Sequence, residues 1–232
     1  MTREDLARWA AWLALATVAW AILMGLVGRS IGRPPSGLPH GFDSPIIAME
    51  LAMSLDELNA IVKGDPEVIR YARAHLLPDF VFPFFYGSLF ILFGLLLRGK
   101  DCVCRRLGAL LVAAGVACIL FDLAENLCLW RALDQSAAFA SLMHKASLAK
   151  WEAVGISAIL ASMLFWPRFP VNQGWKVASI VCSLAYFGAG ATALAGVFVY
   201  PLAIERSMDP LPLAYLVQLF LLYRHRAELL NS

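Results

Sequence analysis

The sequence predicts an all-α integral membrane protein, a bundle of about six transmembrane helices with an external helical cap between spans one and two. Of the 232 residues, 60% are apolar and only 16% are charged, and the mean hydropathy is +0.69. A soluble domain carries roughly 25% charged residues, and a soluble fold could not cover this much apolar surface with so few. The lipid bilayer is therefore the expected surrounding, and residues 1–232 are expected to form a single transmembrane domain.

The spans follow from stretches without charged residues. The first stretch, 9–27, has 19 such residues and suits one bilayer crossing of about 20. A cleaved signal peptide is the alternative, but its apolar part would be shorter, roughly 7–15 residues. The sixth stretch, 210–223, has 14 residues, and the sequence leaves open whether it crosses fully. The predicted spans are residues 9–28, 79–98, 107–130, 147–166, 177–200 and 209–226.

The loop between the first two spans, residues 29–78, is predicted to be external. Its first part is rich in Gly and Pro, whereas residues 44–77 have the pattern of amphipathic helices that lie on the outer membrane surface or over the bundle. Ser54 and Glu57 have the spacing of a capping box. Asp65 and Pro66 form a cap and a first-turn proline. These signals predict two helix starts within the cap.

The distribution of basic residues predicts the orientation. The loop after the second span holds Arg98, Lys100, Arg105 and Arg106, and it is the most basic of the short loops. Cytoplasmic loops carry an excess of Lys and Arg. This loop is therefore expected inside, and with six spans both termini are expected to be cytoplasmic in a multi-pass protein.

The third span contains the most informative polar residues. Its uncharged run, 107–121, has 15 residues and is too short for a crossing of about 20. The helix must therefore continue through Asp122 and Glu125, which carries both carboxylates into the outer part of the bilayer. With about 100° of rotation per residue, Asp122, Glu125 and Asn126 share one helix face.

The second and fourth spans supply further polar residues at the same level. The uncharged run of the fourth span has 14 residues, so Lys150 and Glu152 enter the outer half of the membrane with it. These two residues are two positions apart and face differently. Asp79 opens the second span, and Tyr86 lies on nearly the same face. Pro83 between them predicts either a kink or simply the start of the helix.

The polar residues have two interpretations, and both stay open at this point. Each ionisable group inside a membrane costs about 2.5–3.5 kcal/mol, so such groups mark a functional site by default. Asp122, Glu125 and Asp79 are then the candidate catalytic groups, and the candidate substrate-binding residues are Tyr86, Asn126, Lys150 and Glu152. Alternatively, the charges form an ion-pair lock between the third and fourth spans or extend to the headgroups.

Other kinds of site find little support in the sequence. His144 could join the carboxylates as a metal ligand, but no second histidine is spaced to help it on the same helix, so no metal site is predicted and a solvated loop histidine is favoured. No Gly-rich phosphate loop or nucleophile elbow occurs, and no cofactor is specified. The net charge of +2 argues against nucleic acid as a partner.

Three short motifs resemble a family of small polytopic bacterial membrane proteins to which no activity is attached. The motifs are Glu50-Leu51-Ala52, Asp79-x-x-Phe82-x-x-x-Tyr86 and Asp122-x-x-Glu125-Asn126, and they cover about the first 130 residues. The resemblance implies a fold of about six spans in the bacterial inner membrane.

Three functions are carried forward. The leading one is an acid–base enzyme whose intramembrane carboxylates open to the outer leaflet and act on a lipid or isoprenoid-like, apolar substrate. The second is a transporter or proton-coupled carrier that uses the same carboxylates. The third is a non-catalytic subunit or assembly factor of a membrane complex, or a homo-oligomer, whose charges bind a partner.

Overall fold

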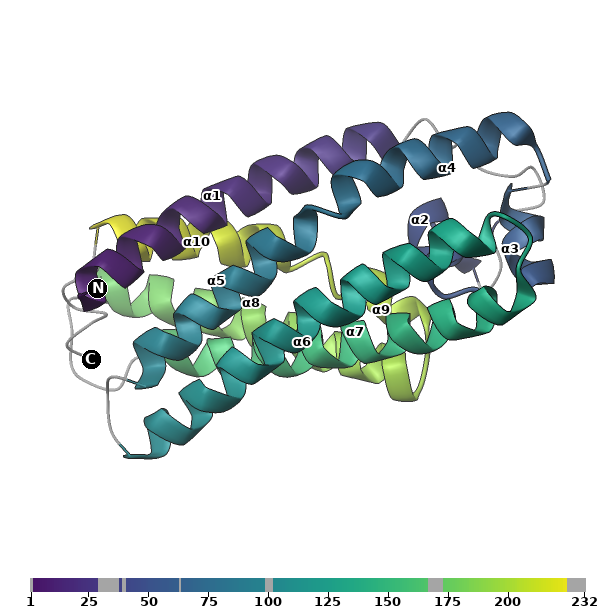
Figure 1. The fold of residues 1–232 in the computed structure, drawn as a ribbon. Helices are drawn as coiled ribbons and strands as arrows, with labels where there is room; N and C mark the ends of the chain where they lie inside the picture. The colour runs from purple at the N-terminus through teal and green to yellow at the C-terminus, as the bar shows by residue number, and fades with distance from the viewer. Residues whose placement is uncertain are drawn as a thin grey trace.

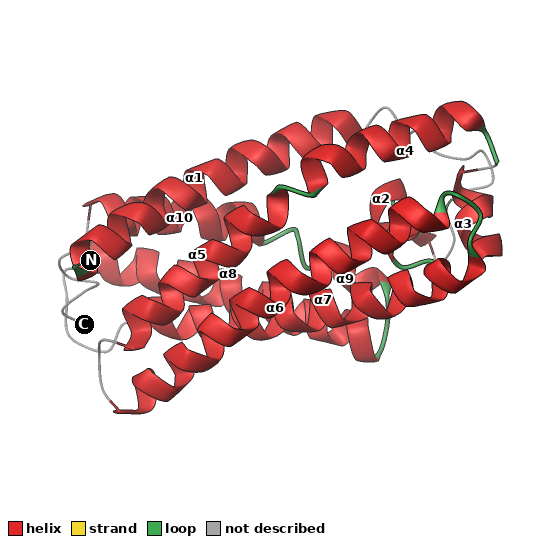
Figure 2. Cartoon of the chain, viewed as in Figure 1, coloured by secondary structure: helices red, strands yellow, loops and turns green. Residues whose placement is uncertain are grey.

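The computed structural model describes residues 2–28, 38, 41–62, 64–98, 102–166 and 173–224, and the regular structure in these ranges is entirely helical (Figure 2). In chain order the helices are α1 (Arg3–Gly28), α2 (Pro45–Glu50), α3 (Leu55–Val62), α4 (Pro66–Asp79), α5 (Phe82–Arg98), α6 (Cys102–Ala132), α7 (Ala137–Phe165), α8 (Gln173–Phe198), α9 (Leu202–Arg206) and α10 (Leu211–Arg224).

Five helical segments are long and apolar enough to cross a membrane, which confirms an all-helical, multi-pass membrane protein. These segments are Arg3–Leu26, Pro66–Arg98, Val103–Ala132, Ala137–Phe165 and Trp175–Phe198. They lie side by side in one elongated bundle, with α5 between α1 and α6 and with α7 between α6 and α8 (Figure 1). Large apolar side chains such as Trp12, Ile22 and Leu120 are exposed on the outside of the bundle, where lipid would cover them.

The second and fourth membrane helices are longer than the sequence predicts. The second was expected to begin at Asp79, but α4 leads into α5 with only a short break at Phe80 and Val81, so both count as one apolar segment (Figure 1). Pro83 lies in the first turn of α5, where its missing N–H leaves no hydrogen bond unmade. In the fourth, α7 begins at Ala137, ten residues before the expected start.

The sixth predicted span is a short helix. α10 has 14 residues and is about 21 Å long, which is less than the roughly 30 Å of a bilayer's hydrocarbon core. The shorter α9 precedes it, and α10 packs against α1 and α8. The structure therefore shows five membrane-length helices and a shorter sixth element within the described residues.

The local signals in the predicted cap are confirmed. The Ser54 hydroxyl accepts a hydrogen bond from the Glu57 backbone N–H at 3.2 Å, and the Glu57 carboxylate accepts one from the Met53 backbone N–H at 2.8 Å. The Asp65 carboxylate accepts the Glu67 backbone N–H at 2.8 Å, with Pro66 as the first residue of α4. α2 and α3 lie near one end of the α6–α7 pair (Figure 1).

Glycines bring α5 and α6 into backbone contact. Gly87 faces Gly115, and Gly94 faces Gly108, so the two pairs lie seven residues apart on both antiparallel helices. A Cβ atom built at Gly94 would lie 2.6 Å from the carbonyl oxygen of Gly108. This close approach is what small residues allow at membrane helix interfaces, and it holds the face of α6 that carries the polar residues close to α5.

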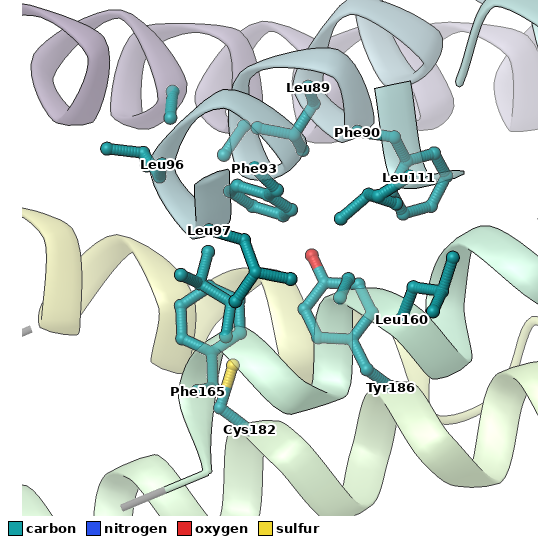
Figure 3. Packing of buried hydrophobic residues seen from close by; sticks show 14 of the residues in the cluster. Leu89, Phe90, Phe93, Leu96, Leu97, Leu111, Leu160, Phe165, Cys182 and Tyr186 are labelled. Atoms are coloured by element: carbon teal, nitrogen blue, oxygen red, sulfur yellow. The ribbon is translucent and has the colours of Figure 1, made fainter. Parts of the chain in front are cut away.

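Two apolar clusters fill the bundle, one toward each end. The first contains Phe93, Phe165 and Tyr186, with the Phe165 and Tyr186 rings stacked at 5.8 Å between centroids (Figure 3). The second joins α2, α3 and α4 to the neighbouring ends of α6 and α7. On α6, Cys118 belongs to the first cluster and Cys128 to the second. The polar residues 122–126 therefore lie between two apolar cores.

Candidate functional site

Asp122, Glu125 and Asn126 are buried together on one face of α6, as the helical spacing predicts. The three residues are 4%, 0% and 1% exposed, respectively. α6 is continuous through these positions, so residues three and four apart fall on the same side of the helix. That side faces the interior of the bundle, and its carboxylates are removed from lipid.

Lys150 on α7 is the cation among these carboxylates. Its Nζ lies 2.7 Å from Glu125 Oε2 and 4.0 Å from Asp122 Oδ1, which links α7 to α6. The same Nζ donates a hydrogen bond to Glu50 Oε2 at 2.8 Å. Lys150 is 5% exposed, and its ammonium also lies 5.1 Å from the centre of the Trp151 ring.

Asp122 receives hydrogen bonds from two side chains. The Tyr86 hydroxyl donates to Asp122 Oδ2 at 2.5 Å, and the Asn126 amide donates to Asp122 Oδ1 at 3.3 Å. Both Tyr86 and Asp122 are buried, so the bond between α5 and α6 forms away from water. Asp122 is therefore held in one orientation from two sides.

Asp79 and His75 extend the cluster onto α4. Asp79, the last residue of α4, is 7% exposed and shares a hydrogen bond with the Asn126 side chain. Asp122 and Glu50 are its electrostatic neighbours. His75, one turn earlier on α4, is also buried and interacts with Glu50. The break between α4 and α5 thus places Asp79 and Tyr86 on the same side of the bundle.

Some polar atoms of the cluster have no hydrogen-bonding partner among the described residues. Glu125 Oε1 and Asn126 Oδ1 are both in this state, and each belongs to a residue that is at most 1% exposed. Buried polar groups in folded proteins are nearly always paired. Asn126 Oδ1 can only accept a hydrogen bond, and an unpartnered Glu125 oxygen can accept one or, when protonated, donate one, so the site is suited to a polar ligand or solvent group.

The charge balance of the cluster is strongly acidic. Glu50, Asp79, Asp122 and Glu125 contribute four negative charges when ionised, and Lys150 contributes one positive charge, which leaves −3. Each buried charge costs several kcal/mol unless it is compensated. A cluster of this composition is expected to hold protons, or to take up a cationic or donor-rich group. In the described part of the chain, no three His, Cys, Asp or Glu side chains are arranged to hold a metal ion.

The structure brings together six of the seven predicted site residues. Asp79, Tyr86, Asp122, Glu125, Asn126 and Lys150 meet, whereas Glu152 is exposed on the other side of α7 and lies outside the cluster. His144 does not reach the carboxylates either. Its ring Nδ1 lies 3.0 Å from the Leu51 carbonyl oxygen and ties α7 to the loop after α2.

Sequence reasoning did not assign Glu50 and His75 to the site. Glu50 ends α2, and its carboxylate meets an ammonium 100 residues further along the chain. One signal was available for it: Glu50 is the lone acidic residue in an otherwise apolar segment, and it belongs to the first of the three motifs. His75 has no such signal.

Comparison with known proteins identifies no relatives. No family model, curated protein or solved structure matches the chain.

Proposed function

We propose that the buried cluster of Glu50, Asp79, Asp122, Glu125 and Lys150 is an intramembrane acid–base site that acts on a lipid or isoprenoid-like substrate. The observation that carries the proposal is the convergence of three carboxyl groups, those of Glu50, Asp122 and Glu125, on the Lys150 ammonium, with a fourth at Asp79 beside them and with unpartnered acceptor atoms in the cluster. A structural lock would need one carboxylate for each cation. An acid–base site needs carboxyl groups in both protonation states side by side, which an excess of acid over base supplies.

Asp122 is the proposed base. Tyr86 and Asn126 orient its two oxygen atoms, and the Lys150 ammonium stands nearby to stabilise negative charge that develops on the substrate. Glu125 in its protonated form is the proposed acid. A proton then moves from a substrate C–H group to Asp122, and a second proton moves from Glu125 to another substrate atom. Between turnovers Asp122 releases its proton to water and Glu125 takes one up from water, which restores the site.

The proposed orientation places this site in the outer half of the membrane. Six basic residues gather at the opposite end of the bundle and mark the cytoplasmic side: Arg3, Arg8, Arg98, Arg105, Arg106 and Lys176. In this arrangement α9 and α10 together bring the chain back to the cytoplasmic end as a sixth crossing, α2 and α3 lie outside, and both termini are cytoplasmic. The resemblance noted above favours the bacterial inner membrane.

Deuterium incorporation tests the proposal without knowledge of the product. The purified protein is reconstituted in vesicles of a bacterial polar lipid extract supplemented with a polyprenyl phosphate, and the vesicles are incubated in D2O. Acid–base chemistry at carbon exchanges substrate hydrogen for deuterium, so at least one lipid gains mass by mass spectrometry, whereas lipids in protein-free vesicles do not. Removing a general base costs roughly 10²–10⁴-fold in rate, so Asp122→Asn should nearly abolish the labelling.

Glu152→Gln is the matched control, because Glu152 is an exposed acid on α7 outside the cluster. It should label lipids at the rate of the unaltered protein. Absence of labelling in every lipid class, or undiminished labelling by Asp122→Asn, would refute the acid–base proposal.

A proton-coupled carrier is the second candidate, and the acidic charge balance favours it specifically. A site with a formal charge of −3 gains most from binding a proton or a cationic substrate. Uptake of a labelled cationic solute into proteoliposomes tests this function. Uptake that is driven by an imposed pH gradient and lost in Asp122→Asn would support a carrier, provided that no lipid becomes labelled in D2O.

A further inference from the structure

Asp79 is the one carboxylate of the cluster that the Lys150 ammonium does not pair with. Lys150 Nζ lies 2.8 Å from Glu50 Oε2, 2.7 Å from Glu125 Oε2 and 4.0 Å from Asp122 Oδ1. Among the described residues no ion pair joins Asp79 to a basic side chain, although Asp79 is only 7% exposed. The cluster therefore contains a buried acid whose charge no basic side chain pairs with, which is costly for an ionised carboxylate.

Asn126 adds an unpartnered oxygen to the same part of the cluster. Its Nδ2 donates a hydrogen bond to Asp122 Oδ1 at 3.3 Å, which directs the amide nitrogen toward that carboxylate and leaves Oδ1 as the other end of the amide. Asn126 is 1% exposed, and Oδ1 has no partner in the described part of the chain. An amide oxygen can only accept hydrogen bonds, and a buried one without a partner costs about 1–3 kcal/mol. A group that donates a hydrogen bond here would stabilise the site.

The donors within the cluster are directed at other acceptors. The Tyr86 hydroxyl donates its proton to Asp122 Oδ2 at 2.5 Å, and the Lys150 ammonium faces Glu50 and Glu125. Acceptor oxygens outnumber donor hydrogens, because four carboxyl groups and an amide oxygen meet one ammonium, one hydroxyl and one amide NH2 group. The excess is one of acceptors and of negative charge together. A ligand that supplies both a positive charge and N–H donors matches this excess.

The two unsatisfied side chains lie on the side of the cluster that faces α4. Asp79 ends α4 and shares a hydrogen bond with the Asn126 side chain on α6, whereas Lys150 reaches the cluster from α7. α5 lies against α6, but beyond the break at Phe80 and Val81 α4 diverges from α6 and packs more against α1 (Figure 1). The more loosely packed pair of helices therefore borders the unsatisfied groups, which suits the entry of a head group from the membrane.

We propose that this side of the cluster binds the primary ammonium of a lipid head group, which pairs with Asp79 and donates a hydrogen bond to Asn126 Oδ1. A primary ammonium has one positive charge and three N–H groups, so it compensates the carboxylate and supplies the donor together. A quaternary ammonium has the charge without the donors, and an alcohol has the donor without the charge. That this lipid is the substrate rests on the acid–base function proposed above; Asp79 then binds the substrate, and Asp122 and Glu125 carry its protons.

Lipid binding to the purified protein tests the ammonium site without any turnover. The detergent-solubilised protein is titrated with phosphatidylethanolamine, phosphatidylcholine or phosphatidylglycerol of identical acyl chains, and native mass spectrometry gives the dissociation constant of the first bound lipid. These head groups end in a primary ammonium, a quaternary ammonium and an uncharged diol, respectively. Phosphatidylethanolamine should bind about 10–100-fold more tightly than the other two, as expected for charge-assisted hydrogen bonds.

Asp79→Asn tests the residue that pairs with the ammonium. The amide keeps the size of the side chain, removes the charge and provides a donor of its own for Asn126 Oδ1. This variant should bind phosphatidylethanolamine about 10–100-fold more weakly, at the level of phosphatidylcholine. Glu152→Gln makes the same change of carboxylate to amide at an exposed position on α7 and should retain the full preference.

Two binding results would overturn the ammonium site. Equal affinity of the unaltered protein for phosphatidylethanolamine and phosphatidylcholine would show that the N–H donors are not recognised. An undiminished preference in Asp79→Asn would show that Asp79 does not pair with the head group.

The labelling experiment in D2O separates this inference from the acid–base function. Mass gain is expected in amine-bearing lipids. Labelling of the polyprenyl phosphate or of phosphatidylglycerol instead would keep the acid–base function and overturn the assignment of an amine-bearing substrate. Selective binding of phosphatidylethanolamine without labelling of any lipid would keep the ammonium site and overturn the acid–base function.

Discussion

Lys150 holds the cluster together, because it is the ammonium that Glu50 and Glu125 share at 2.8 and 2.7 Å. Without it, two carboxylates would face each other and Asp122 in the interior with no compensating charge. Removal of one partner from a buried ion pair costs about 3–5 kcal/mol, far more than the loss of a surface ion pair. Lys150 therefore has a structural role whatever chemistry the site performs.

Lys150→Gln is expected to destabilise the protein by about 3–5 kcal/mol. The measurement is thermal unfolding in detergent, which should show a clear fall in the midpoint. The double variant Lys150→Gln with Glu125→Gln should regain part of the loss, because the uncompensated carboxylate is gone.

Lys145→Gln is the control for that prediction, since Lys145 is exposed on the same helix. It should unfold at the temperature of the unaltered protein. Equal midpoints for Lys145→Gln and Lys150→Gln would show that the buried ion pairs contribute nothing measurable.

At single positions, the sequence predicted the part of the site that helical periodicity determines. The shared face of Asp122, Glu125 and Asn126 follows from their spacing alone. Glu50 could not be placed in the same way, because its contact with Lys150 depends on how the six-residue α2 docks on the bundle. Glu152 was included because the short apolar run of the fourth span carries it into the membrane, and the different face it was expected to occupy is the exposed side of α7.

Pairs of helices depend on close contacts that one substitution can test. In the contact between α5 and α6, Gly94 meets backbone atoms of its partner helix, with Val112 N 2.8 Å from a Cβ built on Gly94. Backbone atoms cannot move aside without separating the helices. Gly188 on α8 is also helical, but nothing lies within 4 Å of a Cβ placed there.

Gly94→Ala is expected to destabilise the bundle by about 1–3 kcal/mol, the usual cost of overpacking. Gly188→Ala should be neutral or stabilising by roughly 0.5–1 kcal/mol, because alanine favours the helix and meets no obstacle. Thermal unfolding of both variants in the same detergent checks the pair of predictions, and a greater loss for Gly188→Ala would contradict the close contact of α5 and α6.

For the helices, the sequence predicted where a helix occurs better than it predicted how long that helix is. Apolar runs and capping residues located the five long helices and the starts of α3 and α4. The lengths of α7 and α10 could not be derived from charge spacing. The first turns of α7 bury Ala140 and Met143 against the cap and leave Ser141 and Lys145 exposed, so no uncharged run marks where the helix begins. α10 is preceded by the turn at 208–210, which no apolar count can predict.

For the whole molecule, the two ends of the bundle differ in charge. The end with Arg3, Arg98 and Arg105 is basic, whereas the end with α3 and the α6–α7 turn carries acidic residues such as Asp56 and Asp134. The positive-inside rule predicts that the basic end lies in the cytoplasm.

Cysteine labelling tests this orientation. Lys145→Cys should react with a membrane-impermeant maleimide added to intact cells, whereas Arg105→Cys should react only after the cells are lysed. Both labelled positions are exposed, whereas the native Cys104, Cys118, Cys128 and Cys182 are buried and should not react. To remove the remaining native thiol, both variants also carry Cys102→Ser. The reverse pattern of labelling would invert the orientation.

The length of α6 has a consequence for the setting in which the carboxylates work. With 31 residues this helix is about 46 Å long, so about a third of it must extend beyond a hydrocarbon core of roughly 30 Å. Asp122 and Glu125 then lie close to the boundary of that core, and hydrophobic mismatch decides how deep they are immersed. A thicker bilayer draws them inward and makes each of their charges more costly, whereas a thinner one brings them toward water. If the cluster acts as proposed, its activity should therefore change with the thickness of the membrane.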